Sequence, residues 1–128
     1  MNLYYLIAGV LIILTGLVHS LLGERMIFKA KRKQGKIVPR IGSPGLDKAS
    51  LGIVWATWHL ASVLGWVLGA ILIQLALIEA PINAVQTFSI QATALGVFLG
   101  SALVLVGTKA KHPGWIAMLI VGILLLLG

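Results

Sequence analysis

The stretch Gly16-Leu17-Val18-His19-Ser20-Leu21-Leu22-Gly23-Glu24-Arg25 lies where the first long apolar segment of the chain meets a run of cations. Residues 1–23 include no Lys, Arg, Asp or Glu, and a histidine sits close to the end of this segment. A helix needs roughly 20 apolar residues to cross the hydrocarbon core of a bilayer. The stretch therefore predicts a first transmembrane helix over residues 3–24.

The composition of the whole chain points the same way. Of its 128 residues, 59% are hydrophobic and 10% are charged, whereas soluble domains carry about 25% charged residues. Most of such a chain has to lie inside lipid, so the sequence predicts an integral membrane protein. The chain has no cysteine, which excludes disulfides, iron–sulfur clusters and thiolate metal sites.

Three further apolar segments follow the first one. The predicted helices cover residues 3–24, 49–78, 84–108 and 112–128, and a polar loop covers residues 25–48. The last segment is short for a span, because each helical residue contributes about 1.5 Å. The predicted fold class is all-α: a four-transmembrane-helix bundle that forms a single transmembrane domain over residues 1–128.

The cations predict how this bundle is oriented. Eight of the ten Lys and Arg residues lie between Arg25 and Lys48, and the other two are Lys109 and Lys111. Loops rich in Lys and Arg stay in the cytoplasm. The basic loop 25–48 and the turn near residue 110 are therefore expected on the cytoplasmic side, and both termini are expected on the non-cytoplasmic side (N-out/C-out).

The basic loop also predicts a lipid partner. Cations beside membrane segments bind anionic headgroups, and we expect this role for Arg25, Lys29, Lys31, Arg32, Lys33 and Lys36. No basic soluble module is present, so nucleic-acid binding is not expected. Glycines spaced by four residues, Gly65 with Gly69 and Gly96 with Gly100, allow helices to approach closely. They predict packing within the bundle, and a homodimer or a larger membrane complex is a second use for them.

Ionisable residues within membrane segments are rare and usually functional. In the predicted topology, His19, His59 and His112 all fall in the cytoplasmic half of the bundle, with Glu24 at its boundary. Two imidazoles on facing helices can ligate haem, which predicts His19 and His59 as cofactor ligands. A divalent metal ion would instead use His19, His59, His112 and Glu24. Haem would favour electron transfer, and a metal ion would favour metal-dependent chemistry in the membrane.

Helical spacing adds two pairs around these residues. Trp55 and His59 are four residues apart, so they share a helix face, and the same holds for Ser20 and Glu24. Other interpretations remain open. The histidines could be hydrogen-bonded structural residues or line a proton or substrate path. The chain could also be a non-catalytic accessory subunit that docks on larger membrane partners and anionic lipid, or a small-molecule transporter.

The elements His19-Ser20-x-x-Gly23-Glu24, Trp58-His59 and His112-Pro113-Gly114-Trp115 occur in this order over the four predicted spans. In this pattern the chain resembles small bacterial four-helix membrane proteins of uncharacterised function. The resemblance implies a bacterial inner-membrane protein and no particular activity. The neighbours His19 and Ser20 are also similar to part of the zinc site of membrane hydrolases that use Ser, His and Asp, although the HxxxH pair of those proteins is absent here.

Overall fold

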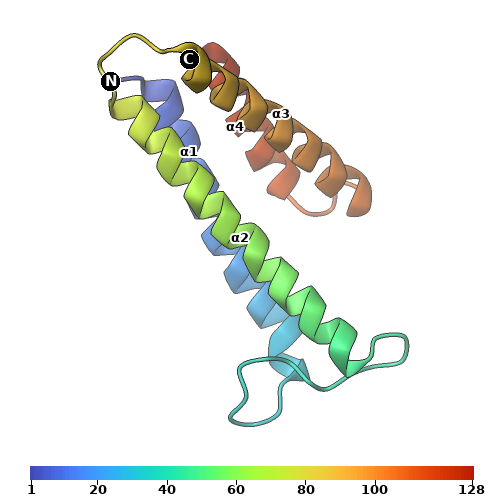
Figure 1. Ribbon diagram of the computed structural model, residues 1–128. Helices are drawn as coiled ribbons and strands as arrows, with labels where there is room; N and C mark the ends of the chain where they lie inside the picture. The colour runs from blue at the N-terminus through green and yellow to red at the C-terminus, as the bar shows by residue number, and fades with distance from the viewer. The chain divides into compact units, whose positions relative to one another are not determined.

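The computed structural model describes residues 1–128 and is all-helical (Figure 1). Helix α1 (Leu3–Gly23) continues into a π turn (Glu24–Phe28) and a 3-10 turn (Lys29–Lys31). After the basic loop come α2 (Lys48–Leu77), α3 (Ala84–Gly107) and α4 (Gly114–Leu127). The predicted all-α class is confirmed, and the helix boundaries agree with the sequence prediction to within two residues.

Three of the four helices are long and apolar enough to cross a membrane: α1 with its following turns, α2 and α3. Helix α4 differs from the predicted fourth span. It has 14 residues and is therefore about 21 Å long, which is less than the roughly 30 Å of a hydrocarbon core. The segment is shorter than predicted because Pro113 precedes the helix and His112 belongs to the turn before it.

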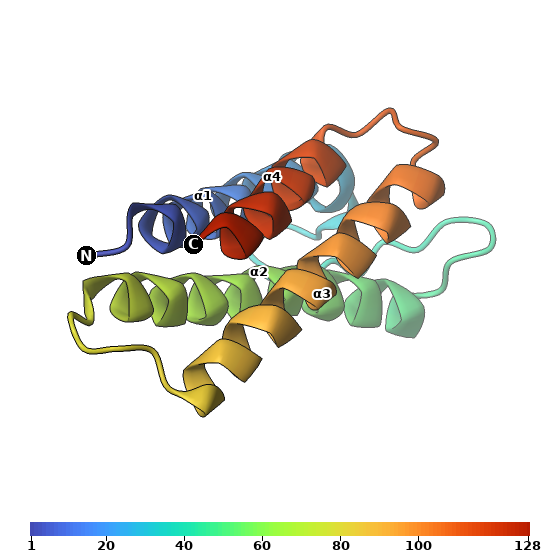
Figure 2. The same ribbon diagram turned by 90° about the horizontal axis from the view of Figure 1, so that it is seen from above.

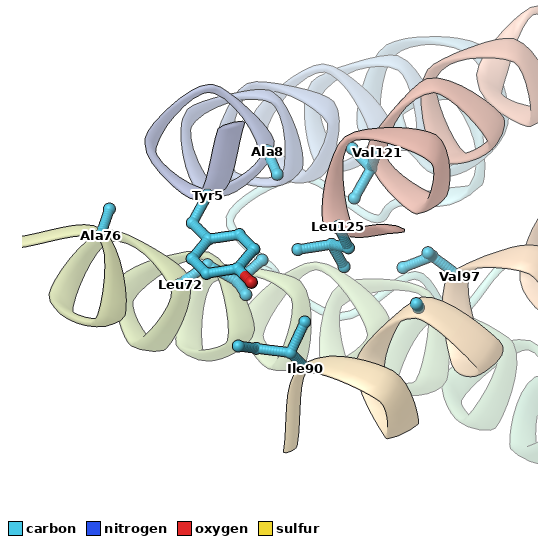
Figure 3. Close-up of a cluster of buried hydrophobic side chains, with 9 residues drawn as sticks. Tyr5, Ala8, Leu72, Ala76, Ile90, Val97, Val121 and Leu125 are labelled. Carbon is cyan, nitrogen blue, oxygen red and sulfur yellow. The ribbon is translucent and has the colours of Figure 1, made fainter. Parts of the chain in front are cut away.

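The chain forms two compact units. Unit 1 comprises Met1–Thr15 and Gly65–Gly128, and unit 2 comprises Gly16–Leu64. All four helices contribute to the core of unit 1, which is drawn in Figure 3. Its buried side chains are Tyr5, Ala8, Leu72, Ala76, Ile90, Ala94, Val97, Val121 and Leu125. In this unit the predicted helix packing is thus present as a core shared by four helices.

Glycines determine how closely the helices of unit 1 approach. Gly9 of α1 and Gly69 of α2 face each other, and a β-carbon on either would lie 2.7 Å from the carbonyl oxygen of the other. Gly100 of α3 packs against Met118 of α4 in the antiparallel pair that Figure 2 shows. Gly96 has no atom near enough to meet an added β-carbon. One glycine of each predicted pair, Gly69 and Gly100, therefore makes a close contact between two helices of this chain.

The outer faces of the helices suit lipid. Phe88 is 70% exposed, and Leu103 and Val106 are each 75% exposed. Several hydroxyl side chains on the helices bond to the backbone of their own helix. The hydroxyls of Thr57, Ser89 and Thr93 each donate to the carbonyl four residues earlier. In a bilayer each polar group has to find a partner within the protein. A largely apolar surface whose hydroxyls are satisfied locally meets that requirement.

Helices α2 and α3, which follow loops, begin with polar caps. Asn83 and Gln86 form a capping box at the start of α3, with both hydrogen bonds at 2.9 Å. Asp47 precedes α2, and its Oδ1 accepts from the backbone N–H of Ser50 at 2.7 Å. Asp47 therefore caps the start of α2.

The Asp47 cap predicts a local dependence on pH. Hydrogen bonds from the backbone and side chain of Ser50 hold the pKa of Asp47 below its ordinary value of 3.8. A lowered folded pKa means that the cap contributes fully above 3.8 and is lost as the pH falls through the lower, folded value. We expect the first turn of α2 to fray in that acidic range. The Ser50 amide resonance in NMR should follow the titration, and Asp47→Asn should abolish this pH dependence. A titration centred above 3.8 would contradict the prediction.

Candidate functional site

The polar residues of unit 2 gather where the end of α1 runs beside the first half of α2. Two adjacent residues of α1, His19 and Ser20, contact two adjacent residues of α2, Trp58 and His59. Neighbours on a helix point about 100° apart. The two helices therefore meet here in two different contacts. Trp58 packs on His19, and the Ser20 hydroxyl meets the His59 ring.

Ser20, His59 and Glu24 form a connected series. The Ser20 hydroxyl lies 2.6 Å from Nδ1 of His59, and Nε2 of the same ring lies 3.4 Å from Oε2 of Glu24. The first contact is a short hydrogen bond, and the second is longer than a good one. Because Ser20 and Glu24 are one helical turn apart, they reach the two nitrogens of a single imidazole. This is the order of groups in a Ser–His–carboxylate triad.

Arg32 closes the series at the other end. Its Nη1 lies 2.6 Å from Oε1 of Glu24, in an ion pair whose side chains are each 27% exposed. The π turn and the 3-10 turn bring the chain back toward α2, and the carbonyl of Lys31 then accepts from the backbone N–H groups of Arg40 and Ile41. At that partial exposure the ion pair is screened by water and adds little to stability. We expect its main effect to be on the position and charge of Glu24.

Trp58 joins the two helices beside this series. Its Nε1 donates to the carbonyl of His19 at 3.0 Å, and its ring stacks on the His19 imidazole with centroids 4.2 Å apart. The indole covers Gly23, where an added β-carbon would overlap it. Phe28 is fully buried and meets the edge of Trp58 at a centroid distance of 6.0 Å. These contacts fix the helix register that brings Ser20 to His59.

Three nitrogen atoms in this cluster are buried and have no hydrogen-bond partner: Nε of Arg32, Nε1 of Trp55 and Nε2 of His59. Trp55 meets the His59 ring at a centroid distance of 5.0 Å, as their spacing on one face predicted. Buried polar atoms without a partner are uncommon in native proteins and destabilise the fold by about 1–3 kcal/mol each. The His59 side chain as a whole is 24% exposed, so the cluster can be reached from outside.

The predicted site residues do not all lie together in the structure. It brings His59 and Glu24 together, whereas His19 packs on Trp58. His112 lies in unit 1, where its Nδ1 accepts from the backbone N–H of Gly114 at 3.1 Å. The sequence prediction omitted Ser20 from the site and treated Arg32 only as a lipid contact. The four-residue spacing of Ser20 and Glu24 was the signal that could have identified Ser20.

No three His, Asp or Glu side chains come together anywhere in the chain as ligands of a metal ion would. Both ring nitrogens of His59 already face protein groups, and an indole lies against His19. Haem ligation by His19 and His59 would require these contacts to rearrange. Ligation of haem or of a divalent metal ion therefore stays a prediction, and the existing contacts favour chemistry by the side chains themselves.

The basic loop joins this cluster through Arg32, which pairs with Glu24. Arg25, Lys29, Lys33 and Lys36 are exposed, and Lys31 and Arg32 are partly buried. Comparison of the chain with protein-family models, with curated proteins and with solved structures gives no match.

Proposed function

We propose that the protein is an integral inner-membrane enzyme in which Ser20 is the nucleophile, His59 its general base and Glu24 the carboxylate that stabilises the protonated imidazole. The reaction class is acyl transfer from a carboxylic ester, ending in hydrolysis. The observation that carries the proposal is the connected series Ser20–His59–Glu24, with the serine hydroxyl 2.6 Å from Nδ1 of the imidazole.

The reaction is derived from these atoms. The Ser20 oxygen attacks the ester carbonyl carbon while Nδ1 of His59 takes the hydroxyl proton. The ester C–O bond then breaks, and His59 returns this proton to the departing alcohol. Water next attacks the acyl-serine with His59 again as base, which releases a carboxylic acid and restores Ser20. Glu24 stays ionised throughout and stabilises the imidazolium.

We propose further that this site lies in the cytoplasmic half of the membrane and that both termini lie on the other side. The distribution of cations supports this orientation, because eight of the ten lie between Arg25 and Lys48. Asn2 donates from its backbone N–H to the carbonyl of Ala76 and from its side chain to the carbonyl of Gly128. These contacts support a common side for both ends of the chain. The exposed cations of the basic segment then face anionic headgroups.

Labelling with a fluorophosphonate tests the proposed nucleophile, because such reagents phosphonylate serines that are activated by a neighbouring base. We expect one adduct on the peptide that contains Ser20 in the detergent-purified protein. His59→Ala should slow the labelling by about a hundredfold or more, the usual contribution of a general base.

The control variant is Ser89→Ala, which removes a hydroxyl that bonds only to its own helix. It should be labelled like the unmodified protein, whereas Ser20→Ala should not be labelled at all. Tryptophan fluorescence during thermal unfolding confirms that each variant is folded. Equal labelling in folded His59→Ala, or no labelling of Ser20, would show that the hydrogen bonds of this series are structural and would overturn the proposal.

A further inference from the structure

We infer that the substrate of this site is an anionic phospholipid and that the unpartnered N–H groups of Arg32 and Trp55 recognise its phosphate. The inference rests on the proposed function for the ester that reacts, but the binding step has its own evidence and its own test. It assigns a specific role to Arg32, distinct from that of the exposed cations around it.

The first evidence is an excess of donors. Nε of Arg32 and Nε1 of Trp55 both carry a hydrogen, and both are buried without a hydrogen-bond partner. They belong to residues linked by contacts, since Arg32 pairs with Glu24, Glu24 approaches His59, and Trp55 packs on His59. Donors without acceptors call for a ligand rich in acceptor oxygens.

The second evidence is the charge of the site. Glu24 is the one carboxylate in the cluster, and its Oε1 takes only Nη1 of Arg32. A guanidinium carries five N–H donors in a planar fork and can bind two anionic groups at different edges. Arg32 can therefore keep its ion pair with Glu24 and hold a phosphate through Nε. Four exposed cations, Arg25, Lys29, Lys33 and Lys36, raise the local concentration of anions.

The third evidence separates a lipid from a free anion. Apolar side chains flank the serine on α1: Leu17 is 43% exposed and Leu21 is 58% exposed. On the facing helix, Ile53 is 64% exposed. A ligand with an anionic head and acyl chains can use both the donors and these apolar faces. Inorganic phosphate can use only the donors, so the combination favours a phospholipid.

Lipid binding to the catalytically inert Ser20→Ala protein tests the inference separately from turnover. Brominated acyl chains in the vesicle lipids quench tryptophan fluorescence on contact, so the quenching reports binding beside Trp55. We expect vesicles of phosphatidylcholine that contain phosphatidylglycerol to bind at least about tenfold more tightly than phosphatidylcholine alone, given the strength of charge-assisted hydrogen bonds. Arg32→Gln in the same background should remove most of this preference.

Arg40→Gln is the matched control, because it removes the same charge from an exposed position in the same loop. It should change the preference less than twofold, a margin expected for a single screened surface charge. Arg32→Lys keeps the charge but not the fork, and it should also lose most of the preference. It serves as the second variant in case Arg32→Gln does not fold.

Equal losses in the Arg32→Gln and Arg40→Gln variants would mean that only bulk charge matters and would overturn the inference. Equal binding of both vesicle types would do the same, as would displacement of the lipid by inorganic phosphate at a comparable concentration. The proposed function fails separately, if Ser20 is not labelled. Selective lipid binding without labelling of Ser20 would support the headgroup site and refute the hydrolytic step.

Discussion

Gly69→Val is expected to lower the free energy of unfolding by about 2–3 kcal/mol, the upper range for overpacking a close contact. A β-carbon on Gly69 would lie 2.6 Å from Cγ1 of Ile13 and 2.7 Å from the carbonyl oxygen of Gly9. A side chain can rotate away, but a backbone carbonyl in a helix cannot. The two helices would therefore have to separate, and unit 1 would lose packing around Leu72.

Thermal or denaturant unfolding in detergent, followed by circular dichroism, measures this effect. The matched control is Gly96→Val, which places the same side chain within a helix at a glycine where an added β-carbon meets no atom. Both changes alter helix propensity equally, so the difference between them reports packing. Similar losses of stability in the two variants would show that the contact between Gly9 and Gly69 is not tight in the folded protein.

The second large effect is expected for Gly23→Ala at the candidate site. The new methyl group would overlap the Trp58 indole, including Nε1, which donates to the carbonyl of His19. The indole is rigid and is held between the helices by its hydrogen bond to His19 and its contact with Phe28, so α1 and α2 would have to move apart at this point. We expect a loss of about 1–3 kcal/mol of stability. We also expect at least about a tenfold slower labelling of Ser20, because displaced reacting groups lose rate steeply.

Two variants distinguish this effect from a general helix effect. Gly107→Ala adds the same methyl group near the end of α3, where nothing lies within reach, and should label Ser20 normally. Trp58→Phe removes the hydrogen bond to His19 and makes room beside Gly23, so combining it with Gly23→Ala should restore part of the lost stability. If Gly23→Ala leaves both stability and labelling unchanged, Trp58 does not set the helix register.

Much of the fold could be predicted from the sequence because long apolar segments without charges leave few choices. Uncharged segments had to be helices, and the Lys and Arg residues marked the loops, so the predicted 49–78 segment lies one residue from Lys48–Leu77. Helix α4 was predicted longer than it is. Apolar character alone does not show that the helix begins only after Pro113, which caps it. The division into two units has no signal in the hydropathy.

The contacts around His59 were predicted only in part. His59 and Glu24 were selected because ionisable residues near a bilayer are costly, and that reasoning is independent of how the helices pack. The partner of each histidine depends on helix register, which Gly23 and Trp58 determine through contact between helices. The sequence prediction grouped His19 with His59 by depth in the membrane. In the structure, helix face matters more than depth, so Ser20 meets His59 and the His19 ring stacks on Trp58.

The π turn that follows α1 has a consequence for how the chain length can vary at this site. Within it the Lys29 N–H bonds the Glu24 carbonyl five residues back, so the turn holds one residue more than an α-helical turn. Each residue added to a helix rotates the following chain by about 100°. Deleting one exposed residue, such as Met26, would place Lys29 four residues after Glu24, so the same backbone bond would close an ordinary α turn. The π turn therefore holds an extra residue locally, and the chain length can change by one here while Arg32 stays opposite Glu24.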